Sequence, residues 1–394
     1  MVNPSILLLE TYATGLAAVH GEQAVYQAFV VKAQRKPLHI VAIGKAAESM
    51  FCGAMRYFHN ELSDYLRSAL IITKRGHFSA AFLEQMAVWG SRVQCLEAAH
   101  PVPDESSLCA GQALIDYLMQ LPKHDNILFL LSGGASSLVE VLADDWSLAK
   151  LQAKTQALLA NGASISEINA VRRELSRIKG GKLWQYLGQR TVECWLISDV
   201  PNDDPHVIGS GLLFPPPVNA DFAWQIVASN QQMLQAMAHA IREQAAEELH
   251  LPVQVMPELL THDAVTAAQN CVEYLRKNPA GWYLWGAETT VVLPENAGRG
   301  GRNQHFALAA ALALQADTAI YLLVAGTDGT DGATDDAGAL VDGDTCQRGK
   351  DENLDPITCL QNADSGTFLA ASGDLISTGV TGTNVMDVVI GLKL

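Results

Sequence analysis

The chain has 394 residues, more than one ordinary hydrophobic core contains, so two domains are predicted. With 49% hydrophobic and 17% charged residues, it has the composition of a soluble globular protein. The formal net charge of −16 argues against a nucleic-acid partner, because nucleic-acid phosphates are repelled unless a concentrated basic face opposes them. A phosphorylated small molecule is still compatible with this charge, because a few local N–H groups and cations outweigh distant surface charge.

Cysteine usage and the hydrophobic runs predict a cytoplasmic protein. The seven cysteines are scattered and form no Cys-x-x-Cys pair, which favours reduced thiols over disulfides or a zinc site. The N-terminal segment carries no basic leader, and no run reaches the roughly 18 apolar residues of a membrane-spanning helix. No membrane partner is therefore expected.

The first half of the chain alternates helix and strand patterns. Apolar residues at helical spacing predict helix between Ser5 and Ala33, and short continuous apolar runs predict strands that are buried on both faces. The predicted strands of this half are 39–44, 69–73, 93–98 and 127–131, with a further strand that begins at Cys194.

Lys45 directly follows the first predicted strand and opens a helix. A cation is mildly disfavoured at a helix N-terminus, so an ammonium group here favours a bound phosphate; an exposed lysine is the alternative. The Gly-x-x-x-x-Gly-Lys-Ser/Thr spacing of a P-loop is missing. His100, in the stiff turn after the third strand, is either a substrate contact or a turn residue bonded to the backbone.

The fourth predicted strand ends in a turn that is rich in glycine and serine. Ser132, Gly133 and Gly134 follow the apolar run at once, and Ser136 comes shortly after. The glycines allow a sharp turn and the close approach of a ligand, and the serines are able to cap the following helix. Gathered N–H groups and a helix dipole favour an anion, typically a phosphate. An ordinary strand-to-helix turn is the alternative.

A long helical region, 148–187, contains a basic face. Its apolar residues fall on one side, which leaves several polar residues toward the others: Asn169, Arg172, Arg173, Ser176 and Lys179. They form either a solvated surface or a cationic patch that faces an anionic substrate. Ser198 and Asp199 follow the fifth strand, where open parallel sheets place their ligand contacts.

The second half repeats the α/β alternation. A Gly- and Pro-rich stretch precedes it, and the domain change is expected between Pro215 and His250. A helix is expected to end near Glu247, and another to run from the glycine-rich segment to Leu314. The remaining predicted elements are strands over 253–256, 281–286, 320–325 and 385–392, and a helix over 263–275.

Two turns of the second half carry charged residues. Gly298–Gln304 places Arg299 and Arg302 in a glycine-rich turn at a helix start, where guanidinium groups favour bidentate binding of phosphate or carboxylate. The acidic turn Gly326–Asp336 does not match an EF-hand, but its carboxylates are suited to Mg²⁺ together with substrate phosphates. An Asx-rich turn is the alternative.

Together these strand-end turns, with Lys45, Arg172 and Arg302, indicate one polyphosphate-binding cleft. Phosphoryl transfer depends largely on positioning and charge stabilisation, and the chain supplies candidates for a phosphate cradle, a metal site and cations. The residues alone predict a two-domain α/β enzyme that handles phosphate, and they leave the acceptor open.

A series of motifs, in the same order from about residue 5 to the end, resembles the glycerate 2-kinase family, the two-domain type with a C-terminal MOFRL domain. The motifs are Ile43-Gly-Lys-Ala-Ala, His100-Pro-Val-Pro-Asp-Glu, Ser132-Gly-Gly, Asn169-Ala-Val-Arg, Ile178-Lys-Gly-Gly, Ile197-Ser-Asp-Val-Pro, Gly300-Gly-Arg-Asn-Gln, Thr327-Asp-Gly-Thr-Asp-Gly and Thr381-Gly-Thr-Asn. The resemblance implies a Rossmann-like three-layer α/β domain over 1–230, a smaller α/β domain with a mixed sheet over 231–394, and an active-site cleft between them.

The resemblance also implies an activity: ATP-dependent phosphorylation of D-glycerate at its 2-hydroxyl, with Mg²⁺, to give 2-phospho-D-glycerate and ADP. The expected partners are D-glycerate and the nucleotide, and the expected state is a monomer or homodimer. Lys45 and Arg302 match the family's two basic active-site residues, with Asp199 as a third candidate catalytic residue. The candidate metal ligands are Asp199, Asp328 and Asp331. The candidate binding residues are Ser132, Gly133, Gly134, Ser136, Asn169, Arg172, Ser198, Gly300, Gly301, Asn303, Gln304 and Thr327.

The sequence departs from the family pattern at Glu174, where His is usual, at His305, where Glu is usual, and at Ala135, where a third Gly is usual. These departures bear on the choice of substrate, and a kinase for a related hydroxy acid is one alternative. A hydroxypyruvate reductase is another, but neither glycine turn gives the Gly-x-Gly-x-x-Gly pattern of a nicotinamide site. A non-catalytic sensor of phosphorylated metabolites is the third, and it would need no metal-ready acids.

Overall fold

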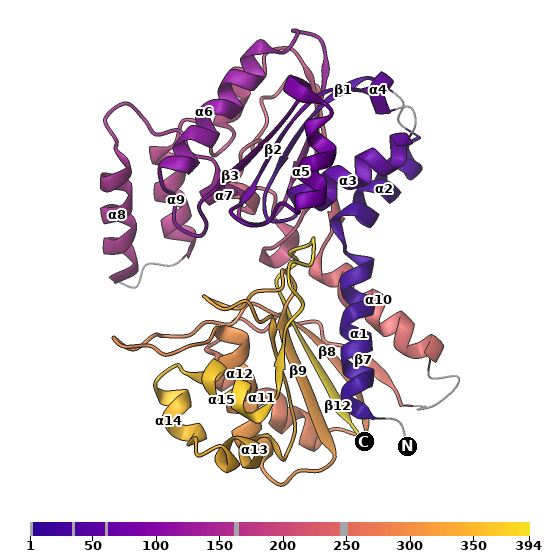
Figure 1. Ribbon diagram of the computed structural model, residues 1–394, viewed down its shortest axis with the longest axis vertical. Helices are drawn as coiled ribbons and strands as arrows, with labels where there is room; N and C mark the ends of the chain where they lie inside the picture. Colours follow the sequence, from indigo (N-terminus) through magenta and orange to yellow (C-terminus); the bar gives the residue numbers. More distant parts are fainter. Residues whose placement is uncertain (1–2, 34–35, 60–61, 161–164, 245–250) are drawn as a thin grey trace. The chain divides into compact units, whose positions relative to one another are not determined.

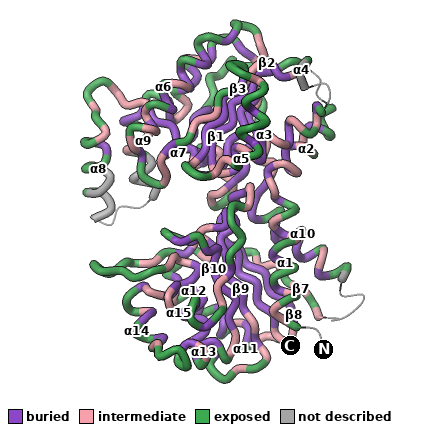
Figure 2. The backbone as a smooth tube through the Cα atoms, viewed as in Figure 1, coloured by how far each residue is buried: buried purple, intermediate pink, exposed green. Residues whose placement is uncertain are grey.

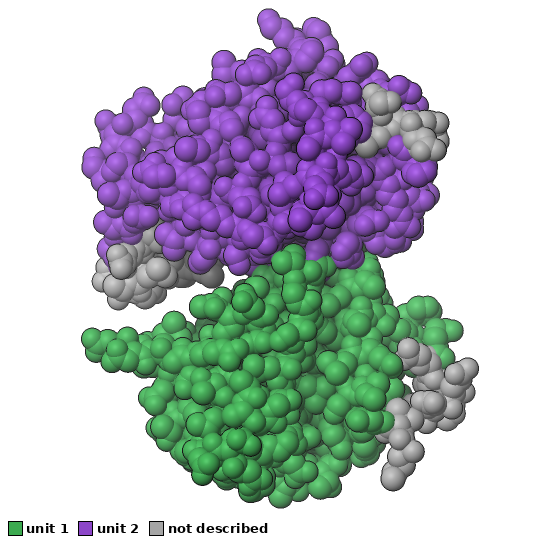
Figure 3. All heavy atoms as spheres, viewed as in Figure 1, with its two compact units in different colours: residues 1–19, 230–381, 385–394 green, residues 20–229, 382–384 purple. Residues whose placement is uncertain are grey.

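The computed structural model describes residues 3–33, 36–59, 62–160, 165–244 and 251–394 (Figure 1). The chain divides into two compact units, coloured separately in Figure 3. Unit 1 contains Met1–Val19, Asn230–Thr381 and Val385–Leu394, and unit 2 contains His20–Ser229 and Gly382–Asn384. The chain passes from unit 2 to unit 1 between Ser229 and Asn230, whereas the first 19 residues belong to unit 1 and the short segment at 382–384 to unit 2.

The first helix belongs to unit 1 because its apolar face packs there. The predicted helical stretch is two helices, α1 (Pro4–Ala18) and α2 (Gly21–Lys32). In α1, Tyr12 is buried and its hydroxyl donates a hydrogen bond to the carbonyl of Gly326, at 2.6 Å. A Cβ on Gly15 would lie only 2.7 Å from Cγ of Met237, so the helix lies close to α10 (Asn230–Gln244).

Unit 2 is built around a parallel sheet in the order β3-β2-β1-β4-β5-β6. Strand β1 is buried along its whole length (Figure 2), and β4 along all but its first residue, which explains their continuous apolar runs. The strand order reverses between β1 and β4, as in Rossmann-like folds. The strands are β1 Leu38–Ile43, β2 Leu66–Lys74, β3 Val93–Ala98, β4 Asn126–Leu131, β5 Thr191–Ile197 and β6 Phe222–Ala228.

Helices cover both faces of this sheet, which confirms the three-layer architecture. On one face, Leu114 of α6 joins the core that contains Ile43 and Phe129. On the other, Phe29 of α2 packs against Trp195 of β5, with ring centroids 4.5 Å apart. The remaining helices of unit 2 are α3 Ala47–Phe58, α4 Leu62–Tyr65, α5 Ala80–Ala87, α6 Glu105–Gln120, α7 Ala135–Leu138, α8 Leu148–Ala160 and α9 Ile165–Leu175.

Unit 1 contains the expected mixed sheet, in the order β11-β10-β9-β12-β8-β7. Strands β7 and β8 pair in parallel, whereas the other neighbouring pairs are antiparallel. Helices α11 and α12 share a core with one face of the sheet. The strands are β7 Val253–Val255, β8 Gly281–Ala287, β9 Ile320–Gly326, β10 Gly338–Val341, β11 Leu375–Ile376 and β12 Asp387–Lys393. The helices are α11 Ala264–Lys277, α12 Arg302–Leu314, α13 Thr345–Asp351, α14 Pro356–Gln361 and α15 Ser365–Ser372.

The predicted long helix over 148–187 is wrong in its extent, and only part of the predicted basic face lies on α9: Asn169, Arg172 and Arg173 do, whereas Ser176 and Lys179 do not. Helix α9 ends at Leu175, and Lys179 lies beyond it, with its ammonium group paired to the Glu140 carboxylate. Both side chains are shielded from solvent, at 0% and 1% exposure. Burial lowers the pKa of Lys179, and the charge of Glu140 opposes that shift. Lys179 is therefore a core residue with an internal counter-ion.

Helix α12 receives its N-terminal cap from a distant residue. The two carboxylate oxygens of Asp331 accept hydrogen bonds from the N–H groups of Asn303 (3.1 Å) and Gln304 (2.8 Å). This satisfies donors that the first turn of a helix leaves without intrahelical acceptors. Burial raises the pKa of Asp331 to about 7, and the two N–H groups oppose that rise.

Removing Lys179 alone should leave Glu140 buried without its cation. Lys179→Met is expected to lower the free energy of unfolding by about 3–5 kcal/mol, the usual effect of breaking a buried ion pair. Urea denaturation followed by circular dichroism measures this change. The double variant Glu140→Leu/Lys179→Met removes both charges and should recover most of the loss. A single variant as stable as the wild type would contradict the expected cost.

The high pKa of Asp331 predicts a pH-dependent stability. Its folded-state pKa of about 7 exceeds its unfolded-state value, so its contribution is complete below about pH 4 and is lost as the pH rises through about 7. The free energy of unfolding of the wild type, relative to Asp331→Asn, should fall by about 1 kcal/mol per pH unit across this window. Chemical denaturation at a series of pH values measures the difference. If the difference in the free energy of unfolding between the wild type and Asp331→Asn stays constant with pH, the pKa of Asp331 is not raised.

Candidate active site

In unit 2, the loops after β1 and β4 lie side by side where the strand order reverses. Ile43 and Leu131, the last residues of the two strands, pair in register. The N–H of Lys45 then donates a hydrogen bond to the carbonyl of Gly133, at 2.9 Å. The N–H of Ala46 donates to the hydroxyl of Ser132, at 3.0 Å. Open α/β sheets bind their ligands at this position, beyond the carboxyl ends of the strands.

Four polar side chains meet at the turn formed by Gly133 and Gly134. A Cβ on Gly133 would overlap the carboxylate of Asp199 and the amide of Asn384, and those two groups lie 3.4 Å apart. A Cβ on Gly134 would lie 3.0 Å from the His100 ring and 3.4 Å from Cγ of Lys45. The glycines are therefore required, because any side chain at Gly133 would push these groups away.

These groups come from separate loops of unit 2. Lys45 follows β1, His100 follows β3 and Asp199 follows β5, so three parallel strands deliver them to one edge of the sheet. Asn384 arrives from the short segment Gly382–Asn384, which is anchored because the carbonyl of Gly382 accepts hydrogen bonds from the Gly21 N–H and the Ser49 hydroxyl. Chemically, the turn combines a cation, a carboxylate, an amide and an imidazole.

The serines near this turn act differently from the expectation. Helix α7 has only four residues, and its cap at Gly134 has no side-chain hydrogen bond, so the prediction that the serines cap this helix is wrong. Ser132 is buried and holds the loop after β1. The hydroxyls of Ser136 and Ser210 are hydrogen-bonded at 2.6 Å, and the buried Ser198 hydroxyl donates to the Val200 carbonyl.

The predicted residues of helix α9 add little to this turn. The side chain of Asn169 lies outside the described residues. Arg172 is partly buried in the last turn of α9, where burial lowers its pKa and the charge of Glu140 opposes that shift. Glu174, the family departure, is exposed and lines a separate cavity of about 490 Å³ together with Arg177 and Lys182.

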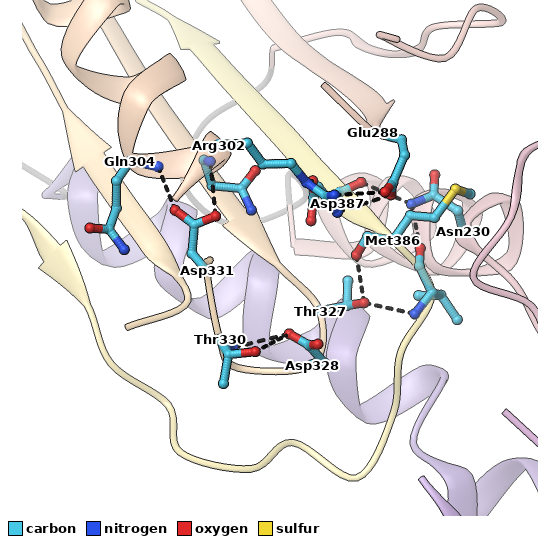
Figure 4. A network of polar contacts seen from close by, with 12 residues as sticks. Asn230, Glu288, Arg302, Gln304, Thr327, Asp328, Thr330, Asp331, Met386 and Asp387 are labelled. Carbon is cyan, nitrogen blue, oxygen red and sulfur yellow. Dashed lines mark hydrogen bonds and ion pairs between the residues drawn. The ribbon is translucent and has the colours of Figure 1, made fainter. Parts of the chain in front are cut away.

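In unit 1, Arg302 is held by two carboxylates at the start of α12 (Figure 4). Its Nε donates to Asp387 at 2.5 Å, while Nη1 and Nη2 donate to the two oxygens of Glu288, at 2.7 and 3.0 Å. Burial opposes the charged form, but Asp387 and Glu288 outweigh it and raise the pKa of Arg302. Arg302 is predicted from its glycine-rich turn, whereas Glu288 is a single acid after β8 with no motif around it and is therefore not predicted.

The other predicted residues of unit 1 serve mainly the interior. Asn303 and Gln304 are almost fully buried, and Asp331 is the cap of α12. The Thr327 hydroxyl donates to the Met386 carbonyl and accepts from the Val385 N–H, so it fixes the start of β12. Asp328 accepts from the Thr330 N–H in a tight turn.

The glycine-rich segment before α12 is likewise tied to structural partners. Gly300 has a φ of +148°, and a Cβ on Gly301 would overlap Asp331, so both positions require glycine. Arg299 pairs with Asp336 at 2.5 Å. His305, the other family departure, is buried, and its ring contacts the Ser365 hydroxyl at 3.2 Å. His305 therefore faces the core.

A clustered metal site and a membrane-spanning helix are both absent from the described residues. No three His, Cys, Asp or Glu side chains in the described part of the chain are grouped as a metal site. Among the described helices, none is both long enough and apolar enough to cross a membrane.

The chain is similar to known proteins over nearly its whole length. The domain of unknown function DUF4147 matches residues 7–245, and the MOFRL family matches residues 281–387. A D-glycerate 2-kinase of Thermotoga maritima is 34% identical, over 98% of this chain and 97% of the relative. A crystal structure of a glycerate kinase from Thermotoga maritima has a TM-score of 0.82 and 31% identity, over 98% of this chain and 99% of that chain.

A third relative, from Agrobacterium vitis, carries the provisional name hydroxypyruvate reductase and is 33% identical over 89% of this chain and 97% of its own length. The DUF4147 match alone covers more than half of the chain. With its full-length similarity to named kinases and the match to MOFRL, the chain belongs to the glycerate 2-kinase family and is a kinase.

Proposed function

We propose that the chain transfers the terminal phosphoryl group of ATP to the 2-hydroxyl of D-glycerate, giving 2-phospho-D-glycerate and ADP. The observation that carries this proposal is the convergence of Lys45, His100, Asp199 and Asn384 on one glycine turn, at the point where the strand order of a Rossmann-like sheet reverses. The names of the relatives supply the substrate. We also assign Arg302 to substrate binding, because its guanidinium group is suited to two-point binding of a carboxylate or phosphate.

In this mechanism Lys45 neutralises the oxygens of the transferred phosphoryl group, because a positioned cation stabilises charge in the transition state. Asp199 orients the 2-hydroxyl, and its carboxylate accepts the hydroxyl proton as the bond from that oxygen to the γ-phosphorus forms. The bond from the γ-phosphorus to the bridging oxygen breaks, and its electron pair leaves with ADP. Asn384 donates to the Asp199 carboxylate and limits its rotation.

The donor set near Gly133 fits Mg²⁺, which prefers one or two carboxylates together with substrate phosphates. Asp199 is only partly buried and offers such a carboxylate, whereas Asp331 has both oxygens engaged as a helix cap. We therefore assign Asp199 as the metal-facing acid, leave Asp328 as the second candidate, and withdraw Asp331. When bound, Mg²⁺ would neutralise charge that develops on the phosphates.

We further propose that the protein is cytoplasmic. All seven cysteines are free thiols, which is typical of proteins in a reducing compartment. A monomer or a homodimer is compatible with this mechanism, because every group assigned to it comes from one chain.

The direct test is ADP release with ATP, Mg²⁺ and D-glycerate, followed by phosphorus NMR of the product. A 2-phosphoglycerate signal is expected. A 3-phospho product would contradict the assigned position on the acceptor. Oxidation of NADH with hydroxypyruvate, without ADP release, would favour the reductase, and Mg²⁺-independent binding without turnover would favour the sensor.

Gly133→Ala should lower turnover strongly while the protein stays folded. The new Cβ would displace Asp199 and Asn384, and a displacement of about 1 Å at reacting groups lowers rates by roughly 10²-fold. Steady-state kinetics with D-glycerate measures the effect. Gly391→Ala is the matched control, because Gly391, like Gly133, is not among the positive-φ glycines, and its Cβ would meet only side-chain atoms, of Leu275 at 3.0 Å and Trp285 at 3.2 Å. Equal activity of the two variants would remove this turn from the mechanism.

A further inference from the structure

The guanidinium group of Arg302 has two edges that meet different carboxylates. Its Nε edge faces Asp387, and its Nη1–Nη2 edge forms a two-point pair with both oxygens of Glu288 (Figure 4). The second arrangement is the one in which arginine binds the carboxylate or phosphate of a ligand. Glu288 therefore occupies the recognition edge of Arg302 with an oxyanion that belongs to the protein itself.

The two carboxylates differ in how firmly they are held. Asp387 is a residue of β12, paired on both sides with β8 and β9, and its side chain is 4% exposed. Glu288 is the first residue after β8, and its side chain is 30% exposed. Partly exposed ion pairs contribute little to stability, whereas a buried pair is difficult to break. An exchange of partners on Arg302 would therefore take place at Glu288.

Charge gives the reason for an exchange. Arg302 carries one positive charge and faces two carboxylates, so the group as a whole is already negative. A ligand anion that joined all three residues would add repulsion without a further cation. If Glu288 leaves as the anion arrives, the charge around Arg302 is conserved and the same two hydrogen bonds form again.

We propose that Glu288 holds the place of a substrate oxyanion on Arg302, and that a carboxylate or phosphoryl group of the ligand displaces it on binding. The exchange rests on the substrate-binding role of Arg302 in the proposed function. Glu288 then sets the affinity of the site: it keeps Arg302 oriented before the ligand arrives and competes with the ligand for the same two nitrogen atoms.

The test uses the full chain and three probes: inorganic phosphate, D-glycerate and ADP. Isothermal titration calorimetry on the wild type, Glu288→Gln and Glu288→Ala gives dissociation constants without any need for turnover. Without the internal competitor, both variants should bind inorganic phosphate more tightly, by about fivefold, the factor that corresponds to ~1 kcal/mol for a partly exposed pair. Adding Arg302→Ala to either Glu288 variant should abolish this gain in phosphate affinity.

Glu295→Gln is the matched control, because it removes one negative charge from an exposed position of the same unit. Glu295 is not one of the two carboxylates that pair with Arg302 in this proposal. It should leave all three constants close to the wild-type values. An equal gain in Glu295→Gln and Glu288→Gln would mean a general charge effect and would overturn the exchange. Unchanged or weaker phosphate binding by both Glu288 variants would overturn it as well.

The other two probes identify the source of the oxyanion. If the Glu288 variants bind D-glycerate more tightly than the wild type does, Arg302 is assigned to the carboxylate of the acceptor. If they bind ADP more tightly, Arg302 is assigned to the phosphoryl chain. If Glu288→Gln binds phosphate more tightly while the wild type releases no ADP with D-glycerate, the exchange stands and the proposed function fails. The two conclusions are therefore tested separately.

Discussion

One hydrogen bond, from the Lys45 N–H to the Gly133 carbonyl, joins the two loops on which the rest of the unit 2 site depends. It forms because the loops follow adjacent parallel strands, whose carboxyl ends lie at the same edge of the sheet. Once the loops are joined, the glycine turn has a fixed position, and the groups from the third and fifth strands meet it there. Backbone contacts, supported by the hydroxyls of Ser132 and Ser49, thus give side chains from distant parts of the sequence a common geometry.

Unit 1 uses a different physical means to position Arg302, a candidate active-site residue. Arg302 is placed by electrostatics, between a carboxylate that is fixed within a sheet and another that lies in a loop. Nearby acids are committed to structure, most clearly Asp331, whose oxygens both serve the N-terminus of α12. A group of acids close to an arginine therefore divides into structural and exchangeable members, and burial distinguishes them.

The sequence predicted the fold well where apolar runs were continuous. The strands β1, β4, β8 and β9 lie close to their predicted positions, because residues buried on both faces leave a clear pattern. It did not predict β10 or α13–α15, because each has only four to eight residues. It assigned the first helix to the wrong unit, because periodicity reveals an apolar face but not its partner. Lys179 was misjudged for a similar reason: a buried counter-ion such as Glu140 leaves no sequence signal.

The segment Gly382–Asn384 affects how the two units are inherited. The chain leaves unit 1 after Thr381, contributes three residues to unit 2, and returns at Val385. A gene fragment that ends after Ser229 would encode the parallel sheet but not the amide beside Asp199. Exchange of the second half between two related genes would also replace that amide. The two units are therefore expected to evolve as one inherited module, even though each has its own sheet and its own core.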